Sequence, residues 1–273
     1  MSESSNETNI AMLRWLVDTG ADEALLEIST NRFAITNRKQ ATGEDTPELS
    51  KRPQAPKIGK ITASAKAVSL STAPGAAREL ANSCSDLSTL KAALDGFEGC
   101  DLKRLATNTV FADGNPEGTI MFIGEAPGRD EDLEGRPFVG RAGQLLDMML
   151  GALALDRSKV YITNILPWRP PNNRNPTPEE AAVCLPFLHR QIELVQPRVL
   201  VLLGAVSARH LLGISGGIMR ARGNWQVYQT QNGGIPAMPT LHPAYLLRQP
   251  SAKRLAWRDF LAITNKIEDL QTA

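Results

Sequence analysis

The sequence predicts a three-layer α/β/α sandwich around a central, mostly parallel four-stranded sheet. Two observations predict it: short apolar runs of strand length alternate with longer segments of helical periodicity, and short loops join them. Strand–helix–strand units of this kind make right-handed crossovers, so the strands run parallel and helices cover both faces of the sheet. The chain has 273 residues, of which 42% are hydrophobic and 22% charged, so it has room for one large domain and extensions.

The N-terminal part is predicted to lie outside this domain. Residues 1–36 form a predicted helical extension, because residues 10–19 place apolar side chains at helical spacing. Residues 37–75 are rich in Lys, Pro, Ser, Thr and Ala and nearly lack large apolar residues. Such a composition cannot bury a core, and it predicts a flexible linker. The main domain is therefore expected at residues 76–273.

Helices and strands alternate along the main domain. The predicted strands are residues 119–123, 160–164 and 198–203, with further strand material at 225–229 and 235–241. The predicted helices are residues 76–83, 87–94, a segment from about 142, a segment that follows Thr177, 204–212 and 251–268. Asp86 is an N-cap candidate for the second helix. Thr177-Pro178-Glu179-Glu180 combines a cap, a first-turn proline and acidic residues, all of which favour a helix start.

The loop after the first strand carries more charge than a simple connection needs. Residues 125–141 hold five carboxylates and three arginines beside one large aromatic residue, Phe138. One interpretation is a solvated turn with Phe138 packed into the core. The other is a ligand site, because open α/β sheets bind ligands at the carboxyl ends of their strands.

Polar residues stand at the carboxyl ends of three predicted strands: Glu125, Asn164 and His242. Convergence at one sheet edge is how such folds build sites, so we expect these side chains to lie together. A lone Asn or His is more often structural, and His189 and His210 keep that interpretation because they fall inside predicted helices. His242 stands where a strand gives way to a loop before a proline, which favours a functional role.

The composition of the chain indicates its cellular compartment and limits its possible binding partners. Three cysteines, an odd number, argue against a disulfide framework and fit a reducing compartment. No apolar run reaches the length of a bilayer span, and no secretory signal pattern opens the chain. We therefore expect a cytoplasmic protein without a membrane partner. A formal net charge of +1 means that any phosphate contact must come from a local basic patch.

Four segments, in order and spacing, resemble the family 4 uracil-DNA glycosylases: GEAPGRDEDLEGRPFVGRAGQLL, VYITNILPWRPPNNR, RVLVLLGAVSARHLLG and HPAYLLR. The resemblance covers roughly residues 86–269. It implies a DNA-repair enzyme that flips uracil out of DNA and hydrolyses its N-glycosidic bond, leaving an abasic site. The implied partner is uracil-containing DNA, single- or double-stranded, with uracil as product, and a monomer suffices for such a site.

The resemblance also implies roles for the candidate site. His242 matches a histidine that donates to uracil O2 as negative charge develops there. Glu125 matches a glutamate that either orients the attacking water or offsets the cationic sugar, and both roles stay open. The substrate-binding set is Gly124, Ala126, Glu131, Phe138 and Asn164.

Within that set, three residues have distinct implied tasks. Asn164 reads the Watson–Crick edge of the flipped base, and cytosine presents the reverse polarity. Phe138 stacks on uracil. Glu131 crowds C5 and so excludes the thymine methyl group. Better-known glycosylases of the superfamily carry an aspartate where Ala126 stands, so the chemistry here leans harder on Glu125 and His242.

DNA binding with base flipping requires groups that bind the phosphates and a side chain, the wedge, that fills the space left in the base stack. The candidate grips are Gly204 and Ala205 at a helix start, Arg169 and Arg174 in the proline-rich loop, and Arg248. Leu246 or Leu247 is the candidate wedge, with core packing as the alternative interpretation.

The resemblance departs from the family in its cysteines. Family 4 enzymes hold an iron–sulfur cluster with four cysteines, but Phe97 and Trp168 stand at two of those positions here. Cys100 and Cys184 alone match, and Cys84 lies at the wrong spacing. Because such a cluster needs four thiolate or equivalent ligands, we expect no metal and no cofactor, with Cys100 and Cys184 close together and reduced.

Two other functions share this fold. The chain could be a catalytically inactive DNA-binding accessory protein, which the missing cysteines also fit. Against this, all five residues implied for catalysis and base recognition are present: Glu125, Glu131, Phe138, Asn164 and His242. Covalent capture of uracil would need a histidine in the loop after the second strand. That loop, PWRPPNNRNPTP, contains none, which argues against capture.

Overall fold

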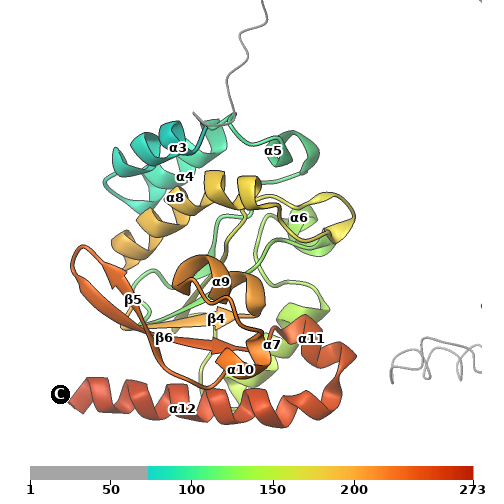
Figure 1. Cartoon of the computed structure of the whole chain (residues 1–273), viewed down its shortest axis with the longest axis vertical. Helices are drawn as coiled ribbons and strands as arrows, with labels where there is room; N and C mark the ends of the chain where they lie inside the picture. Colours follow the sequence, from blue (N-terminus) through green and yellow to red (C-terminus); the bar gives the residue numbers. More distant parts are fainter. Residues whose placement is uncertain (1–72, 273) are drawn as a thin grey trace, which may run out of the picture. The chain divides into compact units, whose positions relative to one another are not determined.

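The computed structural model describes residues 73–272 (Figure 1). The predicted extension at 1–36 and residues 37–72 of the predicted linker lie outside the described residues. Helix α3 (Ala73–Asn82) begins three residues before the predicted start of the main domain. No helix in the described part of the chain is long and apolar enough to cross a membrane.

The strands of residues 73–272 form one six-stranded sheet in the order β1-β3-β2-β4-β6-β5. Their bounds are β1 (Asp113–Gly114), β2 (Ile120–Gly124), β3 (Val160–Asn164), β4 (Val199–Leu203), β5 (Gln226–Thr230) and β6 (Gly233–Thr240). The four central strands run parallel, and β1 and β5 pair antiparallel at the two edges. The mostly parallel α/β sandwich is confirmed. The four parallel strands correspond to the expected four-stranded sheet. Of the two edge strands, β5 falls at the strand material predicted over 225–229, and β1 was not predicted.

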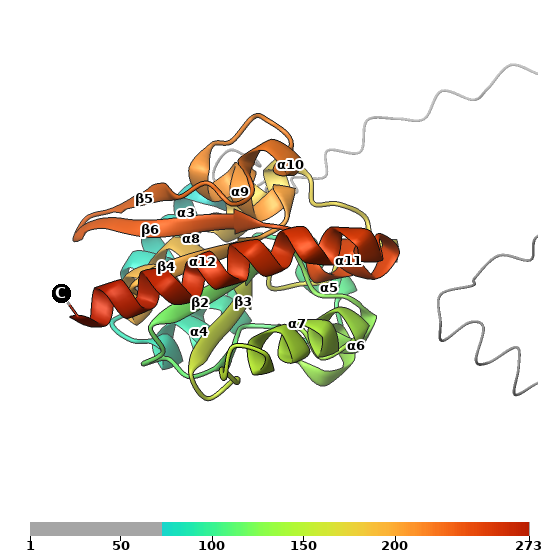
Figure 2. The same ribbon diagram turned by 90° about the horizontal axis from the view of Figure 1, so that it is seen from below.

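The helices lie on both faces of the sheet (Figures 1 and 2). Besides α3, they are α4 (Leu87–Gly96), α5 (Leu102–Leu105), α6 (Arg129–Glu134), α7 (Arg141–Gly151), α8 (Pro178–Val195), α9 (Ala205–Leu212), α10 (Ile218–Ala221), α11 (Pro243–Arg248) and α12 (Lys253–Thr272). Two 3₁₀ turns, η1 (Pro171–Asn173) and η2 (Pro250–Ala252), complete the described elements.

Side-chain alternation along the strands creates two cores. In β2, Met121 and Ile123 pack with helices α3, α4 and α8, whereas Ile120 and Phe122 pack with α7 and α12. Because successive strand residues point to opposite faces, a strand that is apolar throughout buries both of its faces. Figure 2 shows the long helix α12 crossing the second face beside α7.

Caps fix two helix starts as the sequence predicts. Asp86 Oδ1 accepts from the Thr89 N–H at 2.8 Å, and Thr89 Oγ1 accepts in return from the Asp86 N–H. Thr177 and Glu180 make the same reciprocal pair at the start of α8. Each of these capping boxes satisfies backbone donors that the helix itself leaves unpaired.

The short helices α5, α6, α10 and α11 were not predicted. Helix α6 lies inside the charged loop that we expected to be irregular. Its first turn carries three acidic residues, which the positive end of a helix favours, and Gly135 ends it with a left-handed φ of 69°. With six residues it is too short to show helical periodicity in the sequence.

Candidate active site

The carboxyl ends of the central strands surround a cavity of about 370 Å³. Eight of the predicted site residues line it: Glu125, Ala126, Glu131, Phe138, Asn164, Arg174, His242 and Arg248. Sequence reasoning missed eight others, among them the larger or polar residues Pro170, Asn173, Asn175 and Tyr245. All four stand in segments that the sequence analysis had singled out, the proline-rich loop and HPAYLLR, but no pattern marks them individually.

The floor of the cavity is built where β2 and β3 lie side by side. Gly124 and Asn164 are register partners in these parallel strands. A Cβ on Gly124 would lie 2.3 Å from Asn164 Oδ1 and 2.6 Å from Phe138 Cζ. Glycine is therefore required at this position, because the amide and the aromatic ring both approach the backbone there.

Asn164 presents an acceptor to the cavity. Its side chain is buried, and Oδ1 accepts no hydrogen bond from the described residues. A buried polar atom without a partner costs about 1–3 kcal/mol. The position of this atom in the cavity lining fits a ligand that offers an N–H group.

Phe138 forms one wall of the cavity. Its ring is 5% exposed and stacks on the His242 ring with centroids 5.6 Å apart. The backbone of Phe138 has a φ of 56°, in the left-handed region that a bulky residue rarely adopts. Such conformations cost about 1–3 kcal/mol and concentrate at functional sites.

His242 is the N-cap of α11. Its Nδ1 accepts from the Ala244 N–H at 3.1 Å, which places the ring proton of the neutral imidazole on Nε2. Burial, and then the positive charge of Arg248, lower the pKa of His242 to about 4. At neutral pH the ring is therefore an uncharged donor. Gly204 allows its close approach, because a Cβ there would lie 3.1 Å from His242 Cβ.

The two glutamates of the cavity differ in their surroundings. Burial raises the pKa of Glu125 above its ordinary value, which makes this carboxylate a better proton acceptor. Glu131 Oε1 accepts from the Val139 and Gly140 N–H groups at 3.1 and 3.0 Å, and its Oε2 accepts from the Gly128 N–H at 3.0 Å. Glu131 therefore braces the loop as well as lining the cavity.

Two of the arginines predicted to bind DNA phosphates also make contacts within the protein. Arg174 pairs with Glu180 at 2.5 Å, and Arg169 Nε donates to Asn173 Oδ1 at 2.7 Å. Arg248 is exposed at the cavity, on the last turn of α11. Ala205 begins α9 directly after Gly204, whose φ of 98° is open to glycine alone.

The structure corrects one of the two wedge candidates. Leu246 is fully buried and packs with Leu145, Leu241 and Ala256 in a third hydrophobic cluster. It is one turn along the buried face of α11 from His242, so it cannot reach a DNA stack. Leu247 is 37% exposed and remains the wedge candidate.

The residues at the implied cluster positions form a packed apolar region. Phe97, Cys100, Trp168 and Cys184 are all buried in one core cluster, where the Phe97 and Phe187 ring centroids lie 5.2 Å apart. Hydrogen bonding with Cys184 lowers the pKa of Cys100, and that contact and burial raise the pKa of Cys184, so the two thiols are neighbours.

A cluster does not fit this region. Two thiols and two aromatic side chains cannot supply four iron ligands. Within residues 73–272, no group of three or more His, Cys, Asp or Glu side chains is placed to hold a metal ion. Cys84, Cys100 and Cys184 are all free thiols.

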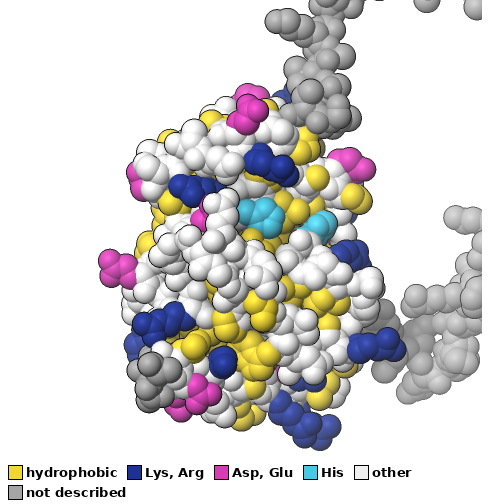
Figure 3. Space-filling model, turned by 60° about the vertical axis from the view of Figure 1, so that its left-hand side comes forward, with side chains coloured by type: hydrophobic (Ala, Val, Ile, Leu, Met, Phe, Trp, Pro, Cys, Tyr) yellow, Lys and Arg dark blue, Asp and Glu magenta, His cyan; other side chains and the backbone are white. Residues whose placement is uncertain are grey.

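The other histidines lie outside the cavity. His189 on α8 makes a 2.5 Å hydrogen bond with the Tyr228 hydroxyl, and burial lowers the pKa of His189. His210 lies on α9. Figure 3, in which histidine is cyan, shows histidine side chains reaching the surface on the face that it presents.

The α/β fold thus holds a cavity with an aromatic ring, a side-chain amide and a neutral imidazole, a lining that suits one flat heterocycle. The chain belongs to the uracil DNA glycosylase superfamily, whose family model matches residues 111–261.

Individual relatives agree with that assignment. A type-4 uracil-DNA glycosylase from Sulfurisphaera tokodaii is 40% identical over 190 residues, 66% of this chain and 86% of the relative. One from Archaeoglobus fulgidus is 44% identical over 170 residues, 60% of this chain and 84% of the relative. One from Thermotoga maritima is 47% identical over 156 residues, 56% of this chain and 78% of the relative.

Proposed function

We propose that this protein is a DNA-repair uracil-DNA glycosylase that hydrolyses the N-glycosidic bond of uracil and leaves an abasic site. Membership of the superfamily and the type-4 relatives support the activity. The observation that carries the base assignment is the unpaired Oδ1 of Asn164 in the cavity lining.

Recognition follows from donor and acceptor polarity. The Asn164 amide accepts from uracil N3–H through Oδ1 and donates to O4 through Nδ2. Cytosine offers an acceptor at N3 and a donor at N4, so both contacts are lost. Phe138 supplies a stacking surface, a contact worth about 1–3 kcal/mol per base. Glu131, held by three backbone N–H groups, limits the space beside C5.

Cleavage of the glycosidic bond develops negative charge on the uracil and positive charge on the sugar. As the bond between C1′ and N1 breaks, its electron pair moves into the uracil ring and appears partly on O2, and the sugar becomes oxocarbenium-like. The neutral His242 donates through Nε2 to O2 without itself gaining charge. The Glu125 carboxylate either takes a proton from the water that attacks C1′ or stabilises the sugar cation. The released uracil anion takes a proton from solvent.

DNA contacts extend from the cavity. Arg248 is an exposed cation in the cavity lining, and Leu247 fills the vacated stack in this proposal. Arg174 and Arg169 stiffen the proline-rich loop through their own contacts and leave its backbone as the phosphate grip. Gly204 and Ala205 supply helix-start amides for a further phosphate. A monomer suffices for this arrangement, and a cytoplasmic location remains a prediction.

We further propose that the enzyme works without an iron–sulfur cluster, with Phe97 and Trp168 packed where two ligands would be needed. Protein purified without oxygen is expected to carry no stoichiometric iron or sulfide and to show three titratable thiols after denaturation. Activity should survive prolonged incubation with an iron chelator. Stoichiometric iron and sulfide, or loss of activity with the chelator, would contradict this proposal.

The test of the activity is single-turnover cleavage of a labelled oligonucleotide that contains one uracil, followed by alkali to break abasic sites. A matched oligonucleotide with thymine at the same position is the control. We expect scission of the uracil strand alone. DNA binding without scission of any uracil substrate would overturn the enzyme assignment in favour of the accessory protein.

Changing Glu125 to glutamine is expected to lower the single-turnover rate by about 10²- to 10⁴-fold and to change its pH dependence. In the native enzyme the active form is the carboxylate, so the rate should fall as pH drops through the raised pKa of Glu125. In the Glu125→Gln variant that fall should vanish. The residual rate should then stay level down to about pH 4, where His242 gains a proton.

Rates measured between pH 4 and 8 check this expectation, with folding at each pH followed by circular dichroism. An unchanged acid limb in Glu125→Gln would mean that another group controls it.

A further inference from the structure

The stacking ring depends on a backbone conformation that the sequence does not favour. Phe138 has a φ of 56°, in the left-handed region, although its aromatic side chain disfavours that region. A bulky residue keeps such a conformation only where surrounding contacts force it. The contacts that hold Phe138 therefore also determine where its ring lies.

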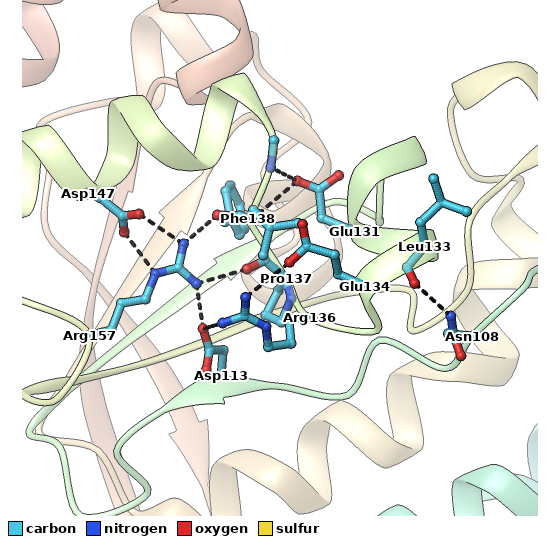
Figure 4. A network of polar contacts seen from close by, with 12 residues as sticks. Asn108, Asp113, Glu131, Leu133, Glu134, Arg136, Pro137, Phe138, Asp147 and Arg157 are labelled. Carbon is cyan, nitrogen blue, oxygen red and sulfur yellow. Dashed lines mark hydrogen bonds and ion pairs between the residues drawn. The ribbon is translucent and has the colours of Figure 1, made fainter.

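Arg157 holds the two carbonyls of this turn (Figure 4). Its Nη1 donates to the Pro137 carbonyl at 3.1 Å, and its Nη2 donates to the Phe138 carbonyl. Two carboxylates fix the guanidinium in turn: Asp147 on α7 lies 2.9 Å from Nε, and Asp113 on β1 lies 2.5 Å from Nη1. The planar fork of arginine makes these contacts together, which a lysine could not do.

The remaining sides of the turn are also occupied. A Cβ on Gly143 would lie 1.6 Å from the Phe138 carbonyl oxygen, so this carbonyl sits directly against the first turn of α7. The next two N–H groups, of Val139 and Gly140, donate to Glu131. Arg157 thus binds the carbonyls and Glu131 binds the amides of one short segment, residues 137–140.

We propose that Arg157 is a positioning residue for base recognition: it holds the strained Phe138 backbone so that the ring stays stacked against His242 and can receive the base. Arg157 itself does not line the cavity and touches no base. It acts through the peptide of Phe138. This inference rests on the proposed function, because it assigns Phe138 to the flipped uracil.

The chain offers a matched control. Arg190 also clamps a backbone carbonyl, donating to Cys84 O from Nε at 3.0 Å and from Nη2 at 2.8 Å, and it pairs with Glu193 at 2.9 Å. Its side chain is 25% exposed and that of Arg157 is 23% exposed. Arg157→Met and Arg190→Met each remove a carbonyl clamp and its ion pairing, although Arg157 also loses a second carbonyl and a second carboxylate. Only Arg157→Met touches the turn that carries Phe138.

Both variants are expected to lower the thermal midpoint, Arg157→Met by more because it loses more contacts, so rates are compared well below both midpoints. Arg157→Met should lower the single-turnover rate at saturating DNA and the affinity for free uracil by about 10- to 100-fold. Arg190→Met should change both by no more than about twofold, as expected for a distant site. The affinity of Arg157→Met for an abasic-site oligonucleotide, which lacks the base, should stay native.

A double-mutant cycle then tests whether Arg157 acts through Phe138. In a Phe138→Leu background, Arg157→Met should cause almost no further loss of rate, because the ring that it positions is gone. Additive losses, equal losses in the two arginine variants, or a native rate in Arg157→Met would each overturn the inference while leaving the glycosylase assignment intact. Absence of uracil excision by the native chain would contradict both the role of Arg157 and the glycosylase assignment.

Discussion

Replacing His242 by alanine is expected to lower the single-turnover rate of uracil excision by about 10²- to 10³-fold, the loss measured when one preorganised donor is removed from an oxyanion site. The neutral ring donates from Nε2 because its Nδ1 is already occupied by the Ala244 N–H. The loss should appear in the chemical step at saturating DNA. Affinity for DNA that contains an abasic site should change little, since no uracil O2 is present there.

The His242→Asn variant is the control for this prediction. Asparagine is a good N-cap, so it keeps an acceptor for the Ala244 N–H and preserves the start of α11. Its shorter amide does not reach the position of Nε2. The Asn variant should therefore be nearly as slow as the Ala variant. Native activity in His242→Asn would mean that helix capping, and not donation to the base, explains the role of His242.

Changing Asn164 to aspartate is expected to lower uracil excision by about 10²- to 10⁴-fold, because a site built around a specific hydrogen-bond pattern rejects the reversed pattern strongly. The carboxylate still accepts from N3–H but cannot donate to O4. It can instead accept from the N4 amino group of cytosine. The ratio of uracil to cytosine excision should therefore fall, because contacts to uracil are lost and a contact to cytosine is gained.

The measurement is single-turnover excision from matched oligonucleotides that contain uracil or cytosine at one position. Asn164→Leu is the steric control, because leucine has a similar size and no polar atom. It should lose uracil excision without gaining any on cytosine. Uracil excision that stays near the native rate in Asn164→Asp would exclude Asn164 as the reader of the base edge.

Buried strands and helix caps were predictable because their determinants are local. Residues 160–164 were predicted as a strand and are β3, since five consecutive residues are buried and turns flank them. Asp86 and Thr177 cap helices as expected, because a capping box lies within four residues of sequence. The meeting of Glu125, Asn164 and His242 around one cavity followed from strand direction alone.

The unpredicted parts depend on contacts between distant segments. Strand β1 has two residues and exists through its pairing with β3. Leu246 and Leu247 are adjacent and chemically identical, and only the packing of α11 against α7 shows which one is buried. The clamp of Arg157 on Phe138 joins residues 19 positions apart, and nothing in the sequence marks either the arginine or the left-handed turn.

Two features of the base pocket lower the free energy of unfolding of this protein. The left-handed backbone of Phe138 and the unpaired Oδ1 of Asn164 each cost the folded chain about 1–3 kcal/mol. A sequence selected for heat resistance alone would keep an apolar residue at 138, would place another at 164, and would lose the reader of the base edge. Thermostable variants that keep their activity should therefore gain their stability from other parts of the domain.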